Sequence, residues 1–249
     1  MIPDLTEEFH DASHTDSLRI SASAPDIHFP QMRYNAPGFA HLSLFINMSH
    51  RSELLSLVAE IRACRKCLEA GYPIAPVPIV GGNPPARIMS IGQAPGPTEV
   101  VAKRPFNAGS GRRLFQWLGE VGFDETAYRA TQWMTAVTKC YPGRSAAGHG
   151  DRVPSAEEQA LCRPWLEREL ALVKPKLIIP IGRLAIGLFF DGKLPLDRII
   201  GTQLEQPGRV IIPLPHPSGA STWTQKPENR ALVKQAIKLI RRQREALGL

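Results

Sequence analysis

Short apolar segments that alternate with segments of helical periodicity place the strongest limit on how this chain folds. The four apolar runs cover residues 88–92, 132–138, 177–182 and 210–214. Amphipathic patterns typical of helices cover residues 111–121, 155–173, 182–190 and 227–245, the last of them basic. Strands separated by helices predict a parallel sheet that is covered by helices on both faces, and therefore an α/β fold.

Three of the four predicted strands run directly into loops rich in glycine, proline or histidine. The loops cover residues 92–96, 139–143 and 216–219. In parallel sheets, ligands bind at the carboxyl ends of the strands. Glycines let a backbone approach a ligand closely and prolines stiffen the loop, although each loop taken singly could be an ordinary turn. Together they predict a binding pocket on one rim of the sheet.

The chain contains four cysteines: Cys64, Cys67, Cys140 and Cys162. A helical pattern over residues 52–67 would carry the C-x2-C pair at its end. Four thiolates could hold zinc or an iron–sulphur cluster, and disulfides or unliganded core cysteines are the alternatives. No secretory signal is visible, so we expect a reducing compartment, the cytoplasm. The isolated third and fourth cysteines favour the cluster over zinc, whose ribbons usually use two C-x2-C pairs.

Charge and composition divide the chain into two parts. The formal net charge is +7, yet residues 1–30 carry six acidic residues against Arg19 alone. We expect residues 1–45 to form a flexible acidic N-terminal tail and residues 46–249 to form the folded domain. A basic body suits a polyanion such as nucleic acid, although many proteins merely have a basic surface. No apolar run has the length of a membrane span, so we expect no membrane partner, and we expect a monomer.

The order of four short motifs resembles the uracil-DNA glycosylase superfamily, and most of all its iron–sulphur branch, often called family 4. The motifs lie at residues 93–96, 104–106, 139–143 and 216–218, interleaved with the cysteines, and the resemblance covers residues 52–240. It implies a three-layer α/β/α sandwich with a central, mainly parallel four-stranded sheet. It also implies a structural 4Fe-4S cluster on the four cysteines, and DNA repair by hydrolysis of the N-glycosidic bond of uracil or a related deaminated base, which leaves an abasic site.

The resemblance also implies roles for individual residues. Such an enzyme has to flip the nucleotide out of the duplex, and negative charge then develops on the departing base. His216 would stabilise that charge at O2, and Phe106 would stack on the base. The bland alternatives are a histidine that caps a turn and a phenylalanine of the core. Asn107 would be a further polar group within reach, and the pocket wall would come from Gln93, Ala94, Pro95 and Gly96.

Several positions depart from the pattern of the family. Gln93 stands where the iron–sulphur branch usually has Glu, and Ala94 where classical uracil glycosylases have Asp. Ala136 and Asp151 each stand where the family commonly has Asn. The usual water-positioning carboxylate is therefore missing, although water can trap an oxocarbenium ion without a strong base. Asp151 or Glu99 could substitute for it.

Basic residues around the predicted pocket are candidates for contact with DNA. Arg112 and Arg113 open the helix after the Phe106 loop, where free N–H groups also favour phosphate. The other candidates are Arg144, Arg152, Ser218 and, as a wedge into the gap left by the flipped base, Trp223. A solvated charged face is the ordinary alternative for exposed arginines.

Two further functions compete with the glycosylase. One is a catalytically weakened module of the same fold that binds damaged or single-stranded DNA. The other is a zinc-stabilised enzyme that uses a Gly/Pro loop for a nucleotide phosphate. The sequence contains neither a Gly-Lys-Ser/Thr phosphate loop nor a full Gly-x-Gly-x-x-Gly fingerprint, which disfavours the second.

Overall fold

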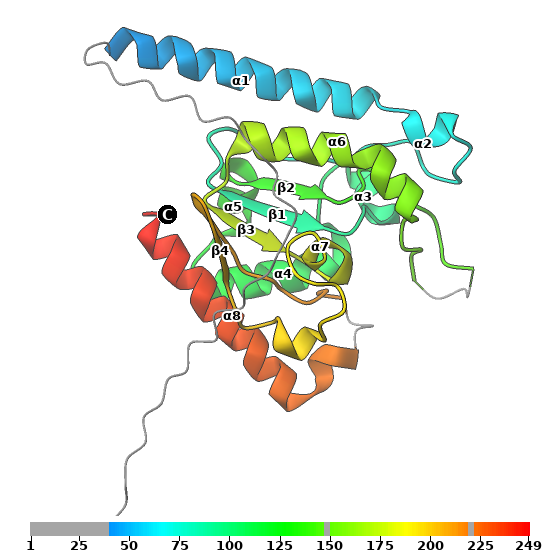
Figure 1. Cartoon of the computed structure of the whole chain (residues 1–249), viewed down its shortest axis with the longest axis vertical. Coiled ribbons are helices and arrows are strands. Elements are labelled where there is room, and N and C mark those ends of the chain that lie inside the picture. Colours follow the sequence, from blue (N-terminus) through cyan, green and yellow to red (C-terminus); the bar gives the residue numbers. More distant parts are fainter. Residues whose placement is uncertain (1–39, 147–149, 219–221) are drawn as a thin grey trace, which may run out of the picture. The chain divides into compact units, whose positions relative to one another are not determined.

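A central five-stranded sheet organises the chain in the computed structural model, which describes residues 40–146, 150–218 and 222–249 (Figure 1). The strand order is β2-β1-β3-β5-β4. Strands β2, β1, β3 and β5 run parallel, and β4 pairs antiparallel with β5. The strands are β1 (Ile88–Gly92), β2 (Trp133–Ala136), β3 (Leu177–Pro180), β4 (Leu204–Gln206) and β5 (Arg209–Ile211).

The predicted α/β class and the mainly parallel sheet are confirmed, but the predicted strand number was wrong. The structure has a fifth strand, β4, at the edge of the sheet. It is three residues long, and its Leu-Glu-Gln sequence is only partly buried, so it carries no apolar run. Its position depends on pairing with β5, which local sequence does not reveal.

The central strands are buried on both faces and separate two apolar cores. All residues of β1, β2 and β3 are buried. Along β1, Ile88 belongs to one core, while Met89 and Ile91 belong to the other, as expected where side chains alternate between the faces of a sheet. Helices therefore cover both faces, and the molecule is a three-layer α/β/α sandwich.

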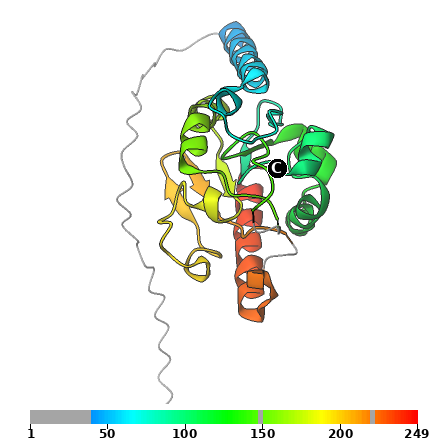
Figure 2. The ribbon, with the colours of Figure 1, turned by 90° about the vertical axis from the view of Figure 1, so that its right-hand side faces the viewer.

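Each face of the sheet is covered by a pair of long helices. Helix α1 (Ala40–Ala63) lies along α6 (Ala156–Val173) on one face, and α4 (Ala108–Val121) lies along α8 (Pro227–Ala246) on the other. Helices α1 and α8 keep to opposite sides of the sheet in both views of the ribbon (Figure 1, Figure 2). None of the helices in the described residues is long and apolar enough to cross a membrane.

The shorter helices fill the connections between the strands. They are α2 (Lys66–Glu69), α3 (Pro97–Ala102), α5 (Glu125–Thr131), α7 (Arg183–Ile186) and the 3-10 turns η1 (Leu196–Arg198) and η2 (Thr222–Gln225). The single helix predicted over residues 52–67 is wrong at its end, because Cys67 lies in the separate α2. Most of the predicted N-terminal tail lies outside the described residues, and α1 begins at Ala40.

Candidate active site and cysteine site

A cavity of about 200 Å³ opens at the carboxyl ends of the parallel strands. It is smaller than a typical pocket for a drug-sized ligand, so it suits a small group. Two of the three predicted loops meet there, and the strand ends supply the floor. The lining includes Ile79, Gly92, Gln93, Ala94, Pro95, Gly96, Glu99, Pro105, Phe106, Asn107, Ser110, Thr135, Ala136, Asp151, Ile181, His216 and Pro217.

The third predicted loop, residues 139–143, lies elsewhere. The chain after β2 pairs with an upstream segment: the Ile79 N–H donates to the Lys139 carbonyl at 2.7 Å, and the Ala75 N–H to the Tyr141 carbonyl at 3.0 Å. This pairing directs Lys139 and Cys140 into the cavity that holds the cysteines. The expectation that all three loops line one pocket is therefore wrong.

Glu99 fastens two walls of the pocket to each other. The side chain is buried, and its Oε2 accepts hydrogen bonds from the Gly96 N–H at 3.0 Å and from the Thr98 hydroxyl at 3.1 Å. Its Oε1 accepts a bond of 2.6 Å from the N–H of Asn107. The carboxylate predicted to face water thus holds the backbone of the 93–96 loop against the loop that carries Phe106.

Phe106 lies on the opposite wall, with its ring against the end of β1. A Cβ atom placed on Gly92 would lie 3.1 Å from Cζ of the ring, so the ring touches the strand backbone. The residue has φ = 50°, in the left-handed region that side chains with a Cβ rarely adopt. Its side chain is half-buried and also packs against one apolar core. Asn107 follows as the residue that begins α4, and its side-chain oxygen accepts a hydrogen bond from Arg104 at 3.0 Å.

His216 faces the same cavity as Phe106, from the loop after β5. Its ring packs on Gly182, where an added Cβ would lie 3.3 Å from Cδ2 and where φ is +84°. The Ser218 N–H donates to Nδ1 at 3.2 Å, so the ring proton of the neutral imidazole is on Nε2. Surrounding protein atoms lower the pKa of His216 because they desolvate the charged form, and the Asp151 carboxylate opposes this in part. At neutral pH the residue is therefore a neutral hydrogen-bond donor.

The Asp151 carboxylate interacts electrostatically with His216 and favours its charged form. It lines the cavity, and its Oδ1 accepts a hydrogen bond of 3.1 Å from the Tyr141 hydroxyl. A backbone bridge between Arg144 and Asp151 returns the chain to this position. The structure thus brings Asp151 and Glu99 to one cavity, where Glu99 is engaged by backbone donors.

The residues predicted to contact DNA lie in different surroundings. Arg112, Arg113 and Arg144 are exposed. Arg152 instead forms a bidentate ion pair with Glu158, with N···O distances of 2.5 and 2.8 Å, and its Nε donates to the Pro142 carbonyl. Its guanidinium is thus committed to holding a loop on α6.

Ser218 and Trp223 have structural contacts of their own. Ser218 orients His216 through its backbone N–H. Trp223 lies in η2, half-buried against an apolar core, which favours packing there. Residues 219–221, which precede Trp223 in the sequence, lie outside the described residues, and the roles of Ser218 and Trp223 toward DNA stay predictions.

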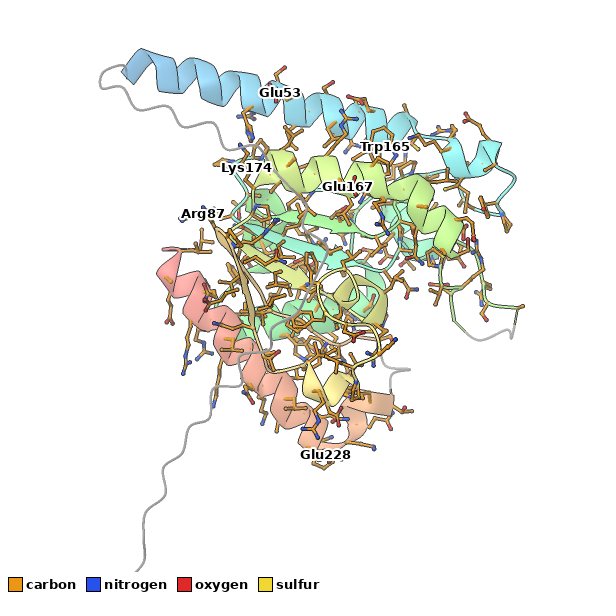
Figure 3. All side chains as sticks on the ribbon, viewed as in Figure 1. Glu53, Arg87, Trp165, Glu167, Lys174 and Glu228 are labelled. Atoms are coloured by element: carbon orange, nitrogen blue, oxygen red, sulfur yellow. The ribbon has the colours of Figure 1, made fainter. Side chains whose placement is uncertain are left out.

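The four cysteines line a second cavity and come from four separate segments. Cys64 follows α1, Cys67 lies in α2, Cys140 follows β2 and Cys162 lies in α6. The Trp165 indole N–H donates to Cys64 Sγ and the Lys139 backbone N–H to Cys162 Sγ, both at 3.3 Å (Trp165 is labelled in Figure 3).

Burial and mutual repulsion set the acidity of these thiols. Burial above all, with repulsion from neighbouring thiols, raises the pKa of Cys67 to about 11 and that of Cys140 to about 12, and burial raises that of Cys162. Within the described residues, no three His, Cys, Asp or Glu side chains are arranged to hold one metal ion.

A buried ion pair connects the cysteine site with the floor of the pocket. Lys139 Nζ lies 2.7 Å from Glu169 Oε2, and both side chains are almost fully buried. Glu169 also accepts hydrogen bonds from the Trp133 indole at 3.0 Å and the Thr135 hydroxyl at 3.1 Å. Lys139 Nζ donates to the Ala136 carbonyl at 2.6 Å. Thr135 and Ala136 are pocket residues, so one network supports both sites.

Sequence patterns did not reveal several of the residues that build the site. Gly182 supports His216, Tyr141 holds Asp151, and Thr135 forms part of the floor. The contact between Gly182 and His216 joins segments that are distant in sequence, whereas Tyr141 and Asp151 lie ten positions apart. Gly182 ends a predicted strand, and a glycine at such a point can indicate a backbone with positive φ.

The fold and the pocket define an α/β sandwich protein with a small ligand site at the carboxyl ends of its strands. Residues 80–241 match the family model of the Uracil DNA glycosylase superfamily, so the chain belongs to this family. The resemblance predicted from the motifs is confirmed.

The chain is similar to named uracil-DNA glycosylases of types 4 and 5. A type-4 uracil-DNA glycosylase of Thermotoga maritima is 30% identical over 174 residues, which are 69% of this chain and 85% of the relative. A type-4 enzyme of Sulfurisphaera tokodaii is 28% identical over 191 residues, 73% of this chain and 80% of the relative. A type-5 uracil-DNA glycosylase of Pyrobaculum aerophilum is 26% identical over 151 residues, 56% of this chain and 63% of the relative.

Proposed function

We propose that this protein is a uracil-DNA glycosylase of the type-4 branch, which hydrolyses the N-glycosidic bond of uracil or a related deaminated base in DNA and leaves an abasic site. The observation that carries the proposal is the pairing of an aromatic ring, Phe106, with a neutral histidine donor, His216, in one small cavity. Membership of the superfamily and the names of the relatives support it.

The two side chains divide the work on the extruded base. Stacking on the Phe106 ring would hold the base, with a contribution of about 1–3 kcal/mol. As the glycosidic bond breaks, negative charge collects on the base, and the Nε2–H of His216 would donate to O2. The bond between Ser218 and Nδ1 holds the proton in place before the reaction, and preorganised donors of this kind contribute about 3 kcal/mol.

The attacking water would be oriented less strongly here than in enzymes with a carboxylate in the 93–96 loop. Gln93 and Ala94 supply no base there, and both oxygens of Glu99 accept hydrogen bonds. Asp151 is then the carboxylate that would stabilise the oxocarbenium ion and orient the water that traps it. The missing loop carboxylate also favours the second candidate, a weakened module that binds damaged or single-stranded DNA.

A 4Fe-4S cluster is the group proposed for the four cysteines. Four sulphurs line one cavity, and two of them receive N–H hydrogen bonds, which suits a cluster with one thiolate ligand for each of four irons. The preference for the cluster over zinc rests on the isolated third and fourth cysteines, since zinc ribbons usually use two C-x2-C pairs. When bound, the cluster would fasten Cys64, Cys67, Cys140 and Cys162 to one another.

DNA would reach the pocket across a basic surface. Arg112 and Arg113 in the second turn of α4, which begins three residues earlier than predicted, together with Arg144, are the exposed cations proposed to contact phosphates. A monomeric state and a cytoplasmic location stay predictions.

A single-stranded oligonucleotide that contains one uracil tests the proposal. Incubation with the protein, followed by alkali and heat, should cut the strand at the uracil, because abasic sites are alkali-labile. His216→Ala should abolish the cut. His50→Ala, in α1, is the matched control and should cut normally. Salt-sensitive binding without any cut by the wild-type protein would refute the glycosylase and support the binding module.

A further inference from the structure

Arg129 of α5 grips the backbone of the loop that carries Phe106. Its Nη1 donates to the Pro105 carbonyl at 2.7 Å, and its Nη2 to the Phe106 carbonyl at 2.6 Å. The guanidinium lies 4.4 Å from the ring centre of Phe115, and Nε pairs with Glu125 at 2.9 Å. Together these contacts hold the planar guanidinium of Arg129 in one position.

The backbone that Arg129 holds has a conformation that needs support from surrounding contacts. Phe106 has φ = 50°, and for a residue with a Cβ this conformation persists only where surrounding contacts impose it. On the far side of its carbonyl, a Cβ at Gly111 would lie 2.0 Å from the oxygen, so the first turn of α4 accepts only glycine there. The backbone of Phe106 is therefore held between the Arg129 guanidinium and the first turn of α4.

The orientation of the ring follows from this backbone conformation. With φ positive, the Phe106 side chain packs against Gly92 and lines the cavity. A return to the ordinary negative region would swing the Cα–Cβ bond away from that direction. We infer that Arg129 is a positioning residue, which aims the Phe106 ring into the base pocket by holding the Pro105 and Phe106 carbonyls. The inference rests on the proposed function for its effect on activity, but not for its effect on the loop.

Two substitutions distinguish the effect of the two carbonyl hydrogen bonds of Arg129 from that of simple packing. Arg129→Met keeps an unbranched apolar side chain but removes the guanidinium and with it both carbonyl bonds. Arg129→Lys keeps a charge but cannot make two parallel bonds. We expect kcat/KM on uracil-containing DNA to fall about tenfold in the methionine variant and less in the lysine variant, mainly through KM, because stacking also holds the ground state.

A double-mutant cycle distinguishes an effect through Phe106 from general damage. If Arg129 acts by aiming the ring, Arg129→Met should change kcat/KM less than about twofold when Phe106 is already alanine. Equal losses with and without the Phe106 ring would overturn the inference, as would unchanged activity of Arg129→Met.

Arg87 offers a matched control for removal of an arginine. It donates to a backbone carbonyl, that of Leu247, at 2.6 Å, and lies at the opposite end of β1 from the pocket (labelled in Figure 3). Arg87→Met should leave kcat/KM unchanged. A loss equal to that of Arg129→Met would count against the inference.

A crystal structure of Arg129→Met gives a readout that does not depend on activity. We expect φ of residue 106 to become negative and the ring to leave Gly92, and if this variant does not fold, Arg129→Lys takes its place. A left-handed Phe106 in the variant would refute the inference. If the wild-type protein released no uracil, the proposed function would fail, whereas the conformation of residue 106 would still decide the role of Arg129.

Discussion

Replacement of Glu99 by glutamine separates a loop-fastening role from a catalytic one. The carboxylate accepts hydrogen bonds from the N–H groups of Gly96 and Asn107 and from the Thr98 hydroxyl. Glutamine keeps one oxygen as an acceptor but turns an NH₂ group toward the other donors. A hydrogen bond to a charged group contributes about 1.5–3 kcal/mol, and a buried donor without a partner costs about 1–3 kcal/mol.

We therefore expect Glu99→Gln to lower the free energy of unfolding by about 2–3 kcal/mol. For a domain of this size the melting temperature should fall by roughly 4–12 °C, measured by calorimetry with the cysteine site in the same state in both proteins. Glu157→Gln is the control, because Glu157 is exposed and is also engaged with a hydroxyl, that of Ser155. A melting temperature equal to that of the wild type, with activity lost, would refute the fastening role and assign Glu99 to the chemistry.

Three further perturbations test other parts of the site. Because burial lowers the pKa of His216 and so favours the neutral imidazole, kcat/KM should fall with acid around a midpoint below 6.5, the ordinary pKa of histidine; a fall centred above 6.5 would contradict this. The unfolded chain binds a proton there first, so His216 also lowers stability as pH falls below 6.5, and His216→Ala should remove that part of the pH dependence. Gly182→Ala places a Cβ 3.3 Å from the His216 ring at φ = +84°, and should cost about 1–2 kcal/mol of stability and about tenfold in kcat/KM, measured by denaturation and by uracil release; unchanged kinetics would show that the contact does not position the ring. Glu169→Gln leaves Lys139 buried without its counter-charge and should lower the free energy of unfolding by about 3–5 kcal/mol in urea titrations, whereas a loss below about 1 kcal/mol would show that the pair is not needed.

The sequence predicted the sheet well because its central strands are continuous apolar runs. Residues 88–92 form β1 with the predicted bounds, since burial on both faces gives a nearly continuous apolar run in which Ser90 is the polar exception and hydrogen-bonds to Tyr128. The edge strand β4 escaped prediction because half-burial and pairing with β5 decide its conformation.

The candidate site was predictable in its motifs but not in its supporting contacts. Phe106 and His216 share a cavity because both follow from loops at strand ends. The position of residues 139–143 depends on their pairing with residues 75–79, and no local sequence pattern predicts this pairing. Arg129 grips the carbonyl of a residue 23 positions earlier, and only the packing of α5 against α4 brings the two together.

The ion pair of Lys139 and Glu169 couples the cysteine site to the pocket in which the base would bind. Lys139 directly precedes Cys140, and its Nζ donates to the Ala136 carbonyl, while Glu169 accepts a hydrogen bond from the Thr135 hydroxyl. Damage that frees the cysteine segments would therefore also loosen the surface on which a base must rest. If the proposed cluster holds the four cysteines, its loss should therefore weaken the binding of a base as well as the fold around the cysteines.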